Sequence, residues 1–158
     1  MKSFSRPAQR QSLAGARLRK HADYLRTYAA ARKRQSASMS WFLAPQAPQT
    51  LEPQIPDASG PHHAQGSPRV GLTVGKVLGR ATERNRIKRR MREALRRHLN
   101  LLPEGFDLIF HPRRNVLTME FLQLEAEIVR ILEQAGSEAS RIVNSSAAAP
   151  QAPGTPVS

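Results

Sequence analysis

The sequence contains no cysteine. This absence excludes a disulfide scaffold, a thiolate nucleophile and a zinc site with cysteine ligands, and it is typical of proteins of the reducing cytoplasm. Aromatic residues make up only 5% of the 158 residues and hydrophobic residues 39%, so a single domain with a modest core is expected. No stretch approaches the roughly 20 apolar residues that a membrane span needs. The basic N-terminus lacks the apolar segment of a secretory signal.

Acidic residues are also scarce, with 12 Asp and Glu against 25 Lys and Arg and a formal net charge of +13. This surplus indicates a polyanionic partner, either a nucleic acid or an anionic membrane surface. The sequence shows no nucleophilic triad, no paired carboxylates at catalytic spacing and no phosphate-binding glycine loop. The adjacent His62 and His63 lack a nearby third ligand, so no metal site is predicted there.

Three stretches are too polar or too rich in proline to predict packed structure. Residues 1–16 and 137–158 are expected to be disordered tails, and residues 45–67 a disordered insertion within one domain that spans residues 17–136. None of the three can bury enough apolar surface to offset the conformational entropy of the chain.

The remaining sequence predicts three strands and three helices. Alternation of apolar and polar residues indicates strands at 38–44, 69–75 and 105–111. Helical periodicity indicates a basic helix with Thr82 as its N-cap and a last helix over residues 118–136. The order α-β-β-α-β-α predicts an α/β two-layer sandwich, in which helices cover one face of a small sheet. The apolar face of the first helix is expected to consist of Leu18, Ala22, Leu25 and Ala29.

The basic helix reads ATERNRIKRRMREALRR over residues 81–97, and the stretch from Arg80 to His98, with both ends included, holds nine Lys or Arg but only two acids. A solvated helix usually alternates opposite charges four residues apart, whereas this helix repeats like charges at that spacing. Arginine in the first turn also opposes the helix dipole. Both costs are relieved when phosphates bind the guanidinium groups. Contact with nucleic acid therefore explains the pattern better than a solvated face does.

A basic amphipathic helix could instead lie on a membrane surface or enter a calmodulin-type groove. Both alternatives require a free apolar stripe, and here the stripe is short and is needed to cover the sheet. The stripe consists of Ile87, Met91, Leu95 and Leu99, with Ala94 and His98 beside it.

The charged residues of this helix follow a longer pattern, A-x-x-R-N-x-x-K-R-x-x-R-E-x-x-R, which begins at Ala81 and ends at Arg96. The pattern resembles the signature of the bacterial ribonuclease P protein component. The stretches RVGLTVGKVLG, LRKHADYLRTY and LPEGFDLIFHPR resemble other segments of that family, so the similarity covers about residues 17–44 and 68–135.

The resemblance implies a small α/β sandwich with a left-handed β-α-β crossover. It implies a protein that joins the catalytic RNA as a monomer, one protein to one RNA, and assists removal of the 5′ leader from precursor tRNA by endonucleolytic cleavage in the cytoplasm. Catalysis and Mg²⁺ would belong to the RNA, so neither a catalytic nor a metal-binding residue is expected in the protein. Members of the family usually carry Ser-Lys-Lys before the basic helix. This chain has Gly75-Lys76-Val77 there, so only the central lysine matches. The residues expected to bind RNA are Lys76, Arg84, Asn85, Arg86, Lys88, Arg89, Arg92 and Arg96.

The resemblance also implies a cleft for the single-stranded leader between the first helix and the sheet. Single-stranded RNA binds aromatic stacking platforms beside positive charge. Tyr24, Tyr28, Phe42 and Thr73 are expected to line this cleft. The alternative for the two tyrosines is partial core packing of their amphipathic rings. Arg17, Arg19, Lys20 and Arg32-Lys33-Arg34 would extend the positive track.

Two other functions fit the same charge. A structural RNA-binding protein of the ribosomal type, without a role in cleavage, needs the same basic helix. A protein nuclease would need its own catalytic groups, and Asp107 and His111 on one strand face are an acid and a base that do not make a nuclease.

Overall fold

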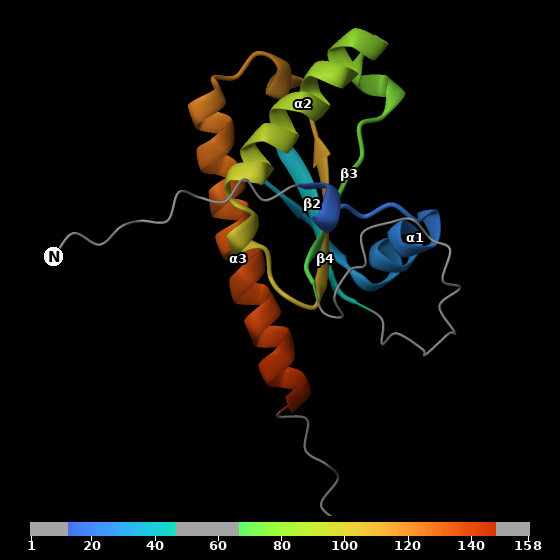
Figure 1. Ribbon diagram of the computed structural model, residues 1–158, viewed down its shortest axis with the longest axis vertical. Helices are drawn as coiled ribbons and strands as arrows, with labels where there is room; N and C mark the ends of the chain where they lie inside the picture. The colour runs from blue at the N-terminus through green and yellow to red at the C-terminus, as the bar shows by residue number, and fades with distance from the viewer. Residues whose placement is uncertain (1–12, 47–66, 148–158) are drawn as a thin grey trace, which may run out of the picture.

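The computed structural model describes residues 13–46 and 67–147, and Figure 1 shows their arrangement. The tails at 1–12 and 148–158 and most of the expected insertion, residues 47–66, lie outside the described residues. The elements, with η for a short 3-10 helix, follow in the order η1 (Leu13–Ala16), α1 (His21–Ala30), β1 (Arg32–Gln35), β2 (Met39–Pro45), β3 (Arg69–Leu72), η2 (Lys76–Leu78), α2 (Ala81–Arg97), η3 (Leu99–Leu101), β4 (Phe106–Pro112), η4 (Arg114–Leu117) and α3 (Phe121–Ala147).

The four strands form one mixed sheet in the order β1-β2-β4-β3. Strand β2 pairs antiparallel with β1 and β4, whereas β3 and β4 run parallel and are connected through α2 as a β-α-β unit. The predicted α/β class is confirmed, with one strand more than expected. Strand β1 was not predicted because its sequence RKRQ has no apolar alternation. It forms by pairing along β2, from Arg32 opposite Leu43 to Gln35 opposite Ser40.

One face of the sheet carries the hydrophobic core. Met39, Trp41 and Leu43 of β2 point to this face, as predicted, together with Leu108 and Phe110 of β4. Helices α2 and α3 lie together over it (Figure 1). The predicted stripe of α2 is buried there at Ile87, Met91, Ala94 and Leu95. Helix α3 adds the buried residues Leu124, Ile128, Ile131 and Leu132.

Helix α1 lies on the opposite face, so the expectation that helices cover only one face is wrong for α1. Its Tyr28 ring contacts Phe42, which alternates along β2 with the core residues Trp41 and Leu43. Figure 1 shows α1 across the sheet from α2 and α3. Two layers of helices therefore enclose the sheet, although α1 is short.

The apolar face predicted for α1 is also wrong. Leu25 has 56% of its surface exposed, and the buried residues of the helix are Asp23 and Thr27. Leu18 is buried, but it precedes the helix and donates its backbone N–H to the carbonyl of Val70 at 2.8 Å. Polar contacts therefore hold α1 to the sheet, because the sheet face beneath it is itself partly polar.

The tail that was expected to be disordered from residue 137 begins with helical structure. Helix α3 begins at Phe121, continues through Gly136 and ends at Ala147, so residues 137–147 are part of the fold. Ala139 is buried, and Glu138 forms an ion pair with Arg34 of β1. Composition suggested a tail because the last turns are rich in Ser and Ala, but contacts with distant residues hold them.

Smaller corrections concern the segments beside the basic helix. Strand β3 ends at Leu72, before the predicted end at 75, and the turn η2 follows. The N-cap of α2 is Arg80, so Thr82 lies inside the helix. Residues 13–16 of the expected N-terminal tail form η1. None of the helices in residues 13–46 and 67–147 is long and apolar enough to cross a membrane.

Candidate nucleic-acid interface

Helix α2 begins at a specific turn. Gly79 has a φ of 128°, a backbone conformation that favours glycine. A Cβ on it would lie 2.0 Å from Glu83 Oε2 and would displace that carboxylate. The same carboxylate accepts the backbone N–H of Arg80 at 2.9 Å, which satisfies one free donor of the first turn. Glu83 therefore supports the N-terminus of a helix whose other early charges are positive.

Three of the arginines on α2 bind other parts of the protein. Arg90 donates to the carbonyl of Leu117 at 2.7 Å and also to that of Met119. Arg96 pairs with Glu93 at 2.7 Å, and this hydrogen bond lowers the pKa of the carboxyl group. Arg97 pairs with Glu93 at 3.3 Å and Glu125 at 3.4 Å, and its guanidinium carbon lies 5.0 Å from the ring centre of Phe121. Among the residues predicted to bind RNA, Arg96 is therefore the one with an acidic partner in the described part of the chain.

The other five cations of α2 form no ion pair with an acid in the part of the chain that the structure describes. Nε of Arg84 is buried, yet it has no hydrogen-bond partner among the described residues. Asn85 is exposed beside it, and Lys76 is exposed in the preceding turn η2. The surface thus holds charge without a counter-charge, which suits an external polyanion. The five, together called the unpaired cations, are Arg84, Arg86, Lys88, Arg89 and Arg92.

A second group of predicted residues gathers where α1 crosses the sheet. The hydroxyl oxygen of Tyr28 lies 2.6 Å from Nε2 of His111 and 3.1 Å from Oγ1 of Thr73. The rings of Tyr28 and Phe42 are 5.0 Å apart, edge to face, and that of His111 is 5.1 Å from Phe42. All four side chains are partly exposed. Tyr28, Phe42, Thr73 and His111 are called the aromatic cluster below.

His111 was not predicted as a site residue. The sequence placed it on the correct face of β4, but only the fold brings it to Tyr28 of α1. Burial lowers the pKa of His111, and the positive charge of Lys33 lowers it further. The ordinary value is 6.5, so the imidazole is neutral at pH 7. It offers hydrogen bonds to the cluster without adding charge.

Tyr24 lies next to this cluster, 6.4 Å from Tyr28 between ring centres. Its hydroxyl donates to the carbonyl of Leu18 at 3.3 Å, and burial raises its pKa. A Cβ at Gly71 would lie 2.8 Å from the Tyr24 ring, so the ring packs against bare backbone of β3. Both tyrosines are thus half-buried with an accessible edge, and their stacking on RNA stays a prediction.

An ion-pair group that the sequence analysis missed holds α1 in place. Arg69 of β3 donates two hydrogen bonds of 2.8 Å to Asp107 of β4 and one of 3.2 Å to Asp23 of α1. Burial alone would lower the pKa of Arg69, but its two carboxylate partners raise it. Both aspartates are buried. The sequence offered one signal for this ion-pair group, namely Asp107 within the apolar run FDLIF. A charged residue that is buried with such a run needs a buried partner.

Within residues 13–46 and 67–147, no three His or acidic side chains come together in a group that could hold a metal ion. The interface therefore consists of cations and partly exposed rings. Such a surface can bind phosphates and bases.

Comparison with known proteins agrees with this geometry. The family model for ribonuclease P matches residues 14–136. The ribonuclease P protein component of Chloroflexus aggregans is 47% identical over 68 residues, which is 42% of this chain and 50% of that protein. The component from Finegoldia magna is 31% identical over 77 residues, 49% of this chain and 68% of that protein. The chain thus spans about half the length of the first of these relatives.

Solved structures show the same fold. The ribonuclease P protein of Thermotoga maritima superposes with a TM-score of 0.58 at 23% identity, over 75% of this chain and 96% of that one. A Staphylococcus aureus ribonuclease P protein, a mutant with defective mRNA degradation activity, superposes with a TM-score of 0.58 at 25% identity, over 77% of this chain and 88% of that one. With the family match over most of the folded residues, these likenesses establish that the chain belongs to the ribonuclease P protein family.

Proposed function

We propose that this chain is the protein subunit of ribonuclease P. In this role it binds the catalytic RNA and the 5′ leader of precursor tRNA, and it assists the cleavage that produces the mature 5′ end of tRNA. The observation that carries the proposal is the set of unpaired cations on α2. These are five side chains, four of them in the family signature, that have no acidic partner in the described part of the chain. Phosphates supply the missing counter-charge.

The two parts of the interface have different tasks in this proposal. The unpaired cations, with Lys76 and Asn85, contact the backbone of structured RNA through charge and hydrogen bonds. Tyr24 and the aromatic cluster receive bases of the single-stranded leader, since rings bind bases by stacking without reading their sequence. The paired Arg96 contributes less than its neighbours because Glu93 already neutralises it.

The chemistry belongs to the RNA in this proposal. Mg²⁺ ions held mainly by RNA phosphates would activate water and stabilise the leaving oxygen. The protein contributes binding and orientation as one copy per catalytic RNA, and it acts in the cytoplasm.

A structural RNA-binding role without any effect on cleavage is the competing function, because it requires the same charged helix. Reconstitution separates the two. The purified chain is mixed with the catalytic RNA of a ribonuclease P and with precursor tRNA at low Mg²⁺, and the cleavage rate is compared with that of the RNA alone. We expect faster cleavage with the chain present. Binding without faster cleavage would support the structural role, and cleavage by the chain alone would place catalysis in the protein.

A further inference from the structure

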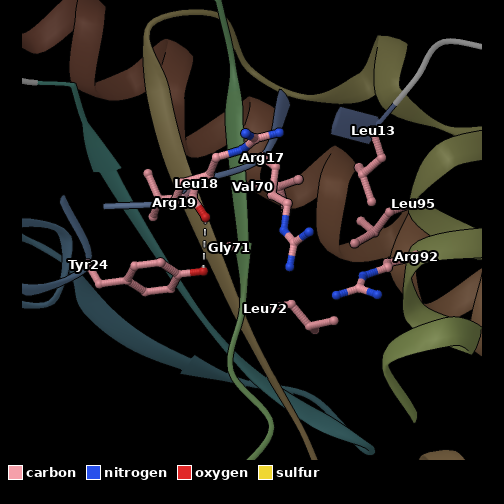
Figure 2. Close-up of a pocket in the computed structure, with 10 residues that line it drawn as sticks. All are labelled: Leu13, Arg17, Leu18, Arg19, Tyr24, Val70, Gly71, Leu72, Arg92 and Leu95. Atoms are coloured by element: carbon pink, nitrogen blue, oxygen red, sulfur yellow. Dashed lines mark hydrogen bonds between the residues drawn. The ribbon is translucent and has the colours of Figure 1, made fainter. Parts of the chain in front are cut away.

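Arginines line hollows at both edges of the sheet. At the β3 edge, Arg17 and Arg92 line a cavity of about 470 Å³ beside Tyr24, and Figure 2 shows the residues around it. This cavity lies between the two parts of the proposed RNA interface and belongs to that interface. At the opposite edge, arginines of β1 line a second pocket, which has no part in the proposed function.

The second pocket lies between β1, the end of β2 and the last turns of α3, and its volume is about 320 Å³. The residues of α3 that line it follow residue 136, where the match to the ribonuclease P family model ends. The pocket is therefore a feature of this chain outside the family match on one of its sides. It is called the C-terminal pocket below, and its lining residues are Ala30, Arg32, Arg34, Leu43, Pro45, Glu138, Arg141 and Ile142.

The C-terminal pocket carries a surplus of positive charge. Its one acid, Glu138, is paired with Arg34, whose Nε is buried and has no hydrogen-bond partner among the described residues. Arg32 and Arg141 form no ion pair with an acid in the same part of the chain. The helix dipole does not explain Arg141, because α3 continues to Ala147 and the dipole acts within the last turn. Two arginines of the pocket therefore lack a counter-charge.

The pocket also offers apolar surface. Leu43 and Ile142 line it, and 39% of the surface of Ile142 is exposed. No aromatic ring is among its described lining residues, so it provides no stacking platform for a base. A phosphate chain would use only the charge of this pocket. A peptide that carries both acids and aliphatic side chains would use its charge and its apolar surface.

Of the three segments outside the described residues, only one has this composition. Residues 1–12 carry basic side chains and no acid, and residues 148–158 carry no charged side chain. Residues 47–66 carry two acids and no Lys or Arg, in a chain whose formal net charge is +13. Both acids lie in the stretch LEPQIPD, together with two aliphatic residues. These four residues are Leu51, Glu52, Ile55 and Asp57.

The ends of residues 47–66 lie beside the pocket. Pro45 lines it, and the side chain of the next residue, Gln46, donates hydrogen bonds to the carbonyls of Ser67 at 2.6 Å and Phe106 at 3.3 Å. Both ends of the segment are therefore fixed at one place. Leu51 is six residues from Pro45, and an extended chain of that length reaches about 20 Å. So short a tether gives an effective concentration on the order of millimolar, at which weak contacts suffice for binding.

We propose that residues 51–57 bind in the C-terminal pocket of the same chain. Their two acids supply the counter-charge that Arg32 and Arg141 lack, and their aliphatic side chains pack against Ile142. The segment thereby holds residues 137–147 of α3 to the sheet. This inference concerns the folded chain by itself and does not depend on the proposed function.

The first test uses the lack of cysteine in the chain, because two introduced cysteines can then pair only with each other. Ile55→Cys is combined with Ile142→Cys, and the yield of disulfide within one chain is measured on non-reducing gels after mild oxidation of dilute protein. The control combines Ile55→Cys with Ser140→Cys, which is exposed on nearly the opposite side of α3. Leu51→Cys replaces Ile55→Cys in a second set. We expect the Ile142→Cys pairs to give a several-fold higher yield than the Ser140→Cys pairs in at least one set.

Equal yields for the two α3 positions in both sets would contradict the proposal. Disulfide-linked dimers whose yield rises with protein concentration would instead assign the pocket to a second copy of the chain.

The second test measures whether the segment and the pocket stabilise the fold together. The acid variant carries Glu52→Gln and Asp57→Gln, and the arginine variant carries Arg32→Gln and Arg141→Gln. At low ionic strength each should lower the Tm by about 1–5 °C, as expected for exposed ion pairs. The combined variant should have no lower Tm than either alone, because both remove the same interaction. Glu133→Gln, exposed elsewhere on α3, is the control, and its effect on the Tm should add to that of the arginine variant.

If the effects of the acid and arginine variants on the Tm add, residues 51–57 do not bind the pocket and the proposal is wrong. Additive effects together with weaker binding of the catalytic RNA by the arginine variant, and a salt slope smaller by about one unit for each lost contact, would assign the pocket to RNA. The cross-linking and the Tm use the protein alone, so their failure is distinguishable from a failure of the cleavage assay.

Discussion

The hydroxyl group of Tyr28 and Nε2 of His111 lie 2.6 Å apart, and this hydrogen bond joins α1 to the inner strand β4. Thr73 contacts the same hydroxyl at 3.1 Å. The ring of Tyr28 therefore has a fixed orientation, and its hydroxyl is occupied within the protein. Any contact of Tyr28 with RNA must use the ring itself.

Replacement of Tyr28 separates ring from hydroxyl. Tyr28→Ala should weaken binding of leader-bearing precursor tRNA by roughly 1–3 kcal/mol, because one stacking platform is lost. Tyr28→Phe keeps the platform and should retain most of that affinity, while unfolding free energy falls by about 0.5–1.5 kcal/mol for the lost hydrogen bonds. Dissociation constants for precursor and mature tRNA in the assembled complex provide the measurement. Equal losses for both RNAs would indicate damaged packing instead of lost stacking.

The unpaired cations should determine the salt dependence of RNA binding. Substitution of Arg84, Lys88 and Arg89 by Ala should weaken binding of the catalytic RNA and reduce the salt slope by about one unit for each lost phosphate contact. Arg97→Gln is the matched control on the same helix, because Arg97 is already held by Glu93 and Glu125. Titrations at several KCl concentrations give the slopes. An unchanged slope in the triple variant would show that these side chains do not meet phosphate.

Arg69 should be the strongest single contributor to the attachment of α1. Arg69→Met would leave Asp23 and Asp107 buried without their shared partner, at a cost of about 3–5 kcal/mol. Urea denaturation measures the loss. Adding Asp107→Asn to Arg69→Met should recover part of it, since one buried charge is then removed. If Arg69→Met lowers the unfolding free energy no more than the substitution of an exposed arginine does, this ion pair does not hold α1 in place.

Glu127 of α3 should make stability depend on pH. Burial alone would raise its pKa, but hydrogen bonds from Ser36 and Ser38, including the Ser38 N–H at 2.9 Å, lower it below the ordinary 4.5. A carboxyl group with a lowered pKa stabilises the fold above its unfolded value, and the contribution is lost as pH falls through the folded value.

Glu127→Gln should therefore lower the unfolding free energy by about 1.5–3 kcal/mol at pH 7, because hydrogen bonds to a charged group are lost. The difference from wild type should narrow as the pH is lowered from about 5 toward 3. Chemical denaturation at several pH values gives the curve. Glu133, which is exposed on the same helix, provides the control. The unfolding free energy of Glu133→Gln should change with pH in the same way as that of the wild type. If the difference in unfolding free energy between Glu127→Gln and wild type stays constant over this pH range, the charge of Glu127 does not stabilise the fold.

Gly136 offers a stabilising substitution within α3. It lies inside the helix, and a Cβ there would have no atom within 4 Å among its described surroundings. Gly136→Ala should raise the unfolding free energy by about 0.5–1 kcal/mol, since alanine loses less backbone entropy in a helix. Urea denaturation is again suitable, with RNA affinity unchanged. A loss of stability would contradict the helical conformation of residue 136.

Local patterns predicted three of the four strands and the two amphipathic helices α2 and α3. The alternation of Met39, Trp41 and Leu43 and the stripe from Ile87 to Leu95 report which side of an element is apolar, and an apolar side must be buried. The same rule failed for α1. Its apolar residue Leu25 is exposed, because Asp23 and Thr27 occupy the buried side and make specific polar contacts.

The arginines of α2 show the same limit. Their number and spacing predicted a phosphate-binding helix, but their charge does not show which of them have partners within the protein. Only the fold places the Leu117 carbonyl beside Arg90 and leaves Nε of Arg84 without a hydrogen-bond partner among the described residues. The edge strand β1 and the last turns of α3 likewise depend on partners far away in the chain, such as Arg34 for Glu138.

The sequence by itself determined the family signature, the positive charge and the apolar periodicity that buries one side of α2. These properties are local, since each depends on residue types at short, regular spacing. The tertiary structure alone decided which cations are neutralised, where α1 attaches and that Arg17 faces Arg92 across a cavity. Such pairings depend on distances between residues remote in the chain, and the electrostatic and hydrogen-bond energies that follow change steeply with those distances.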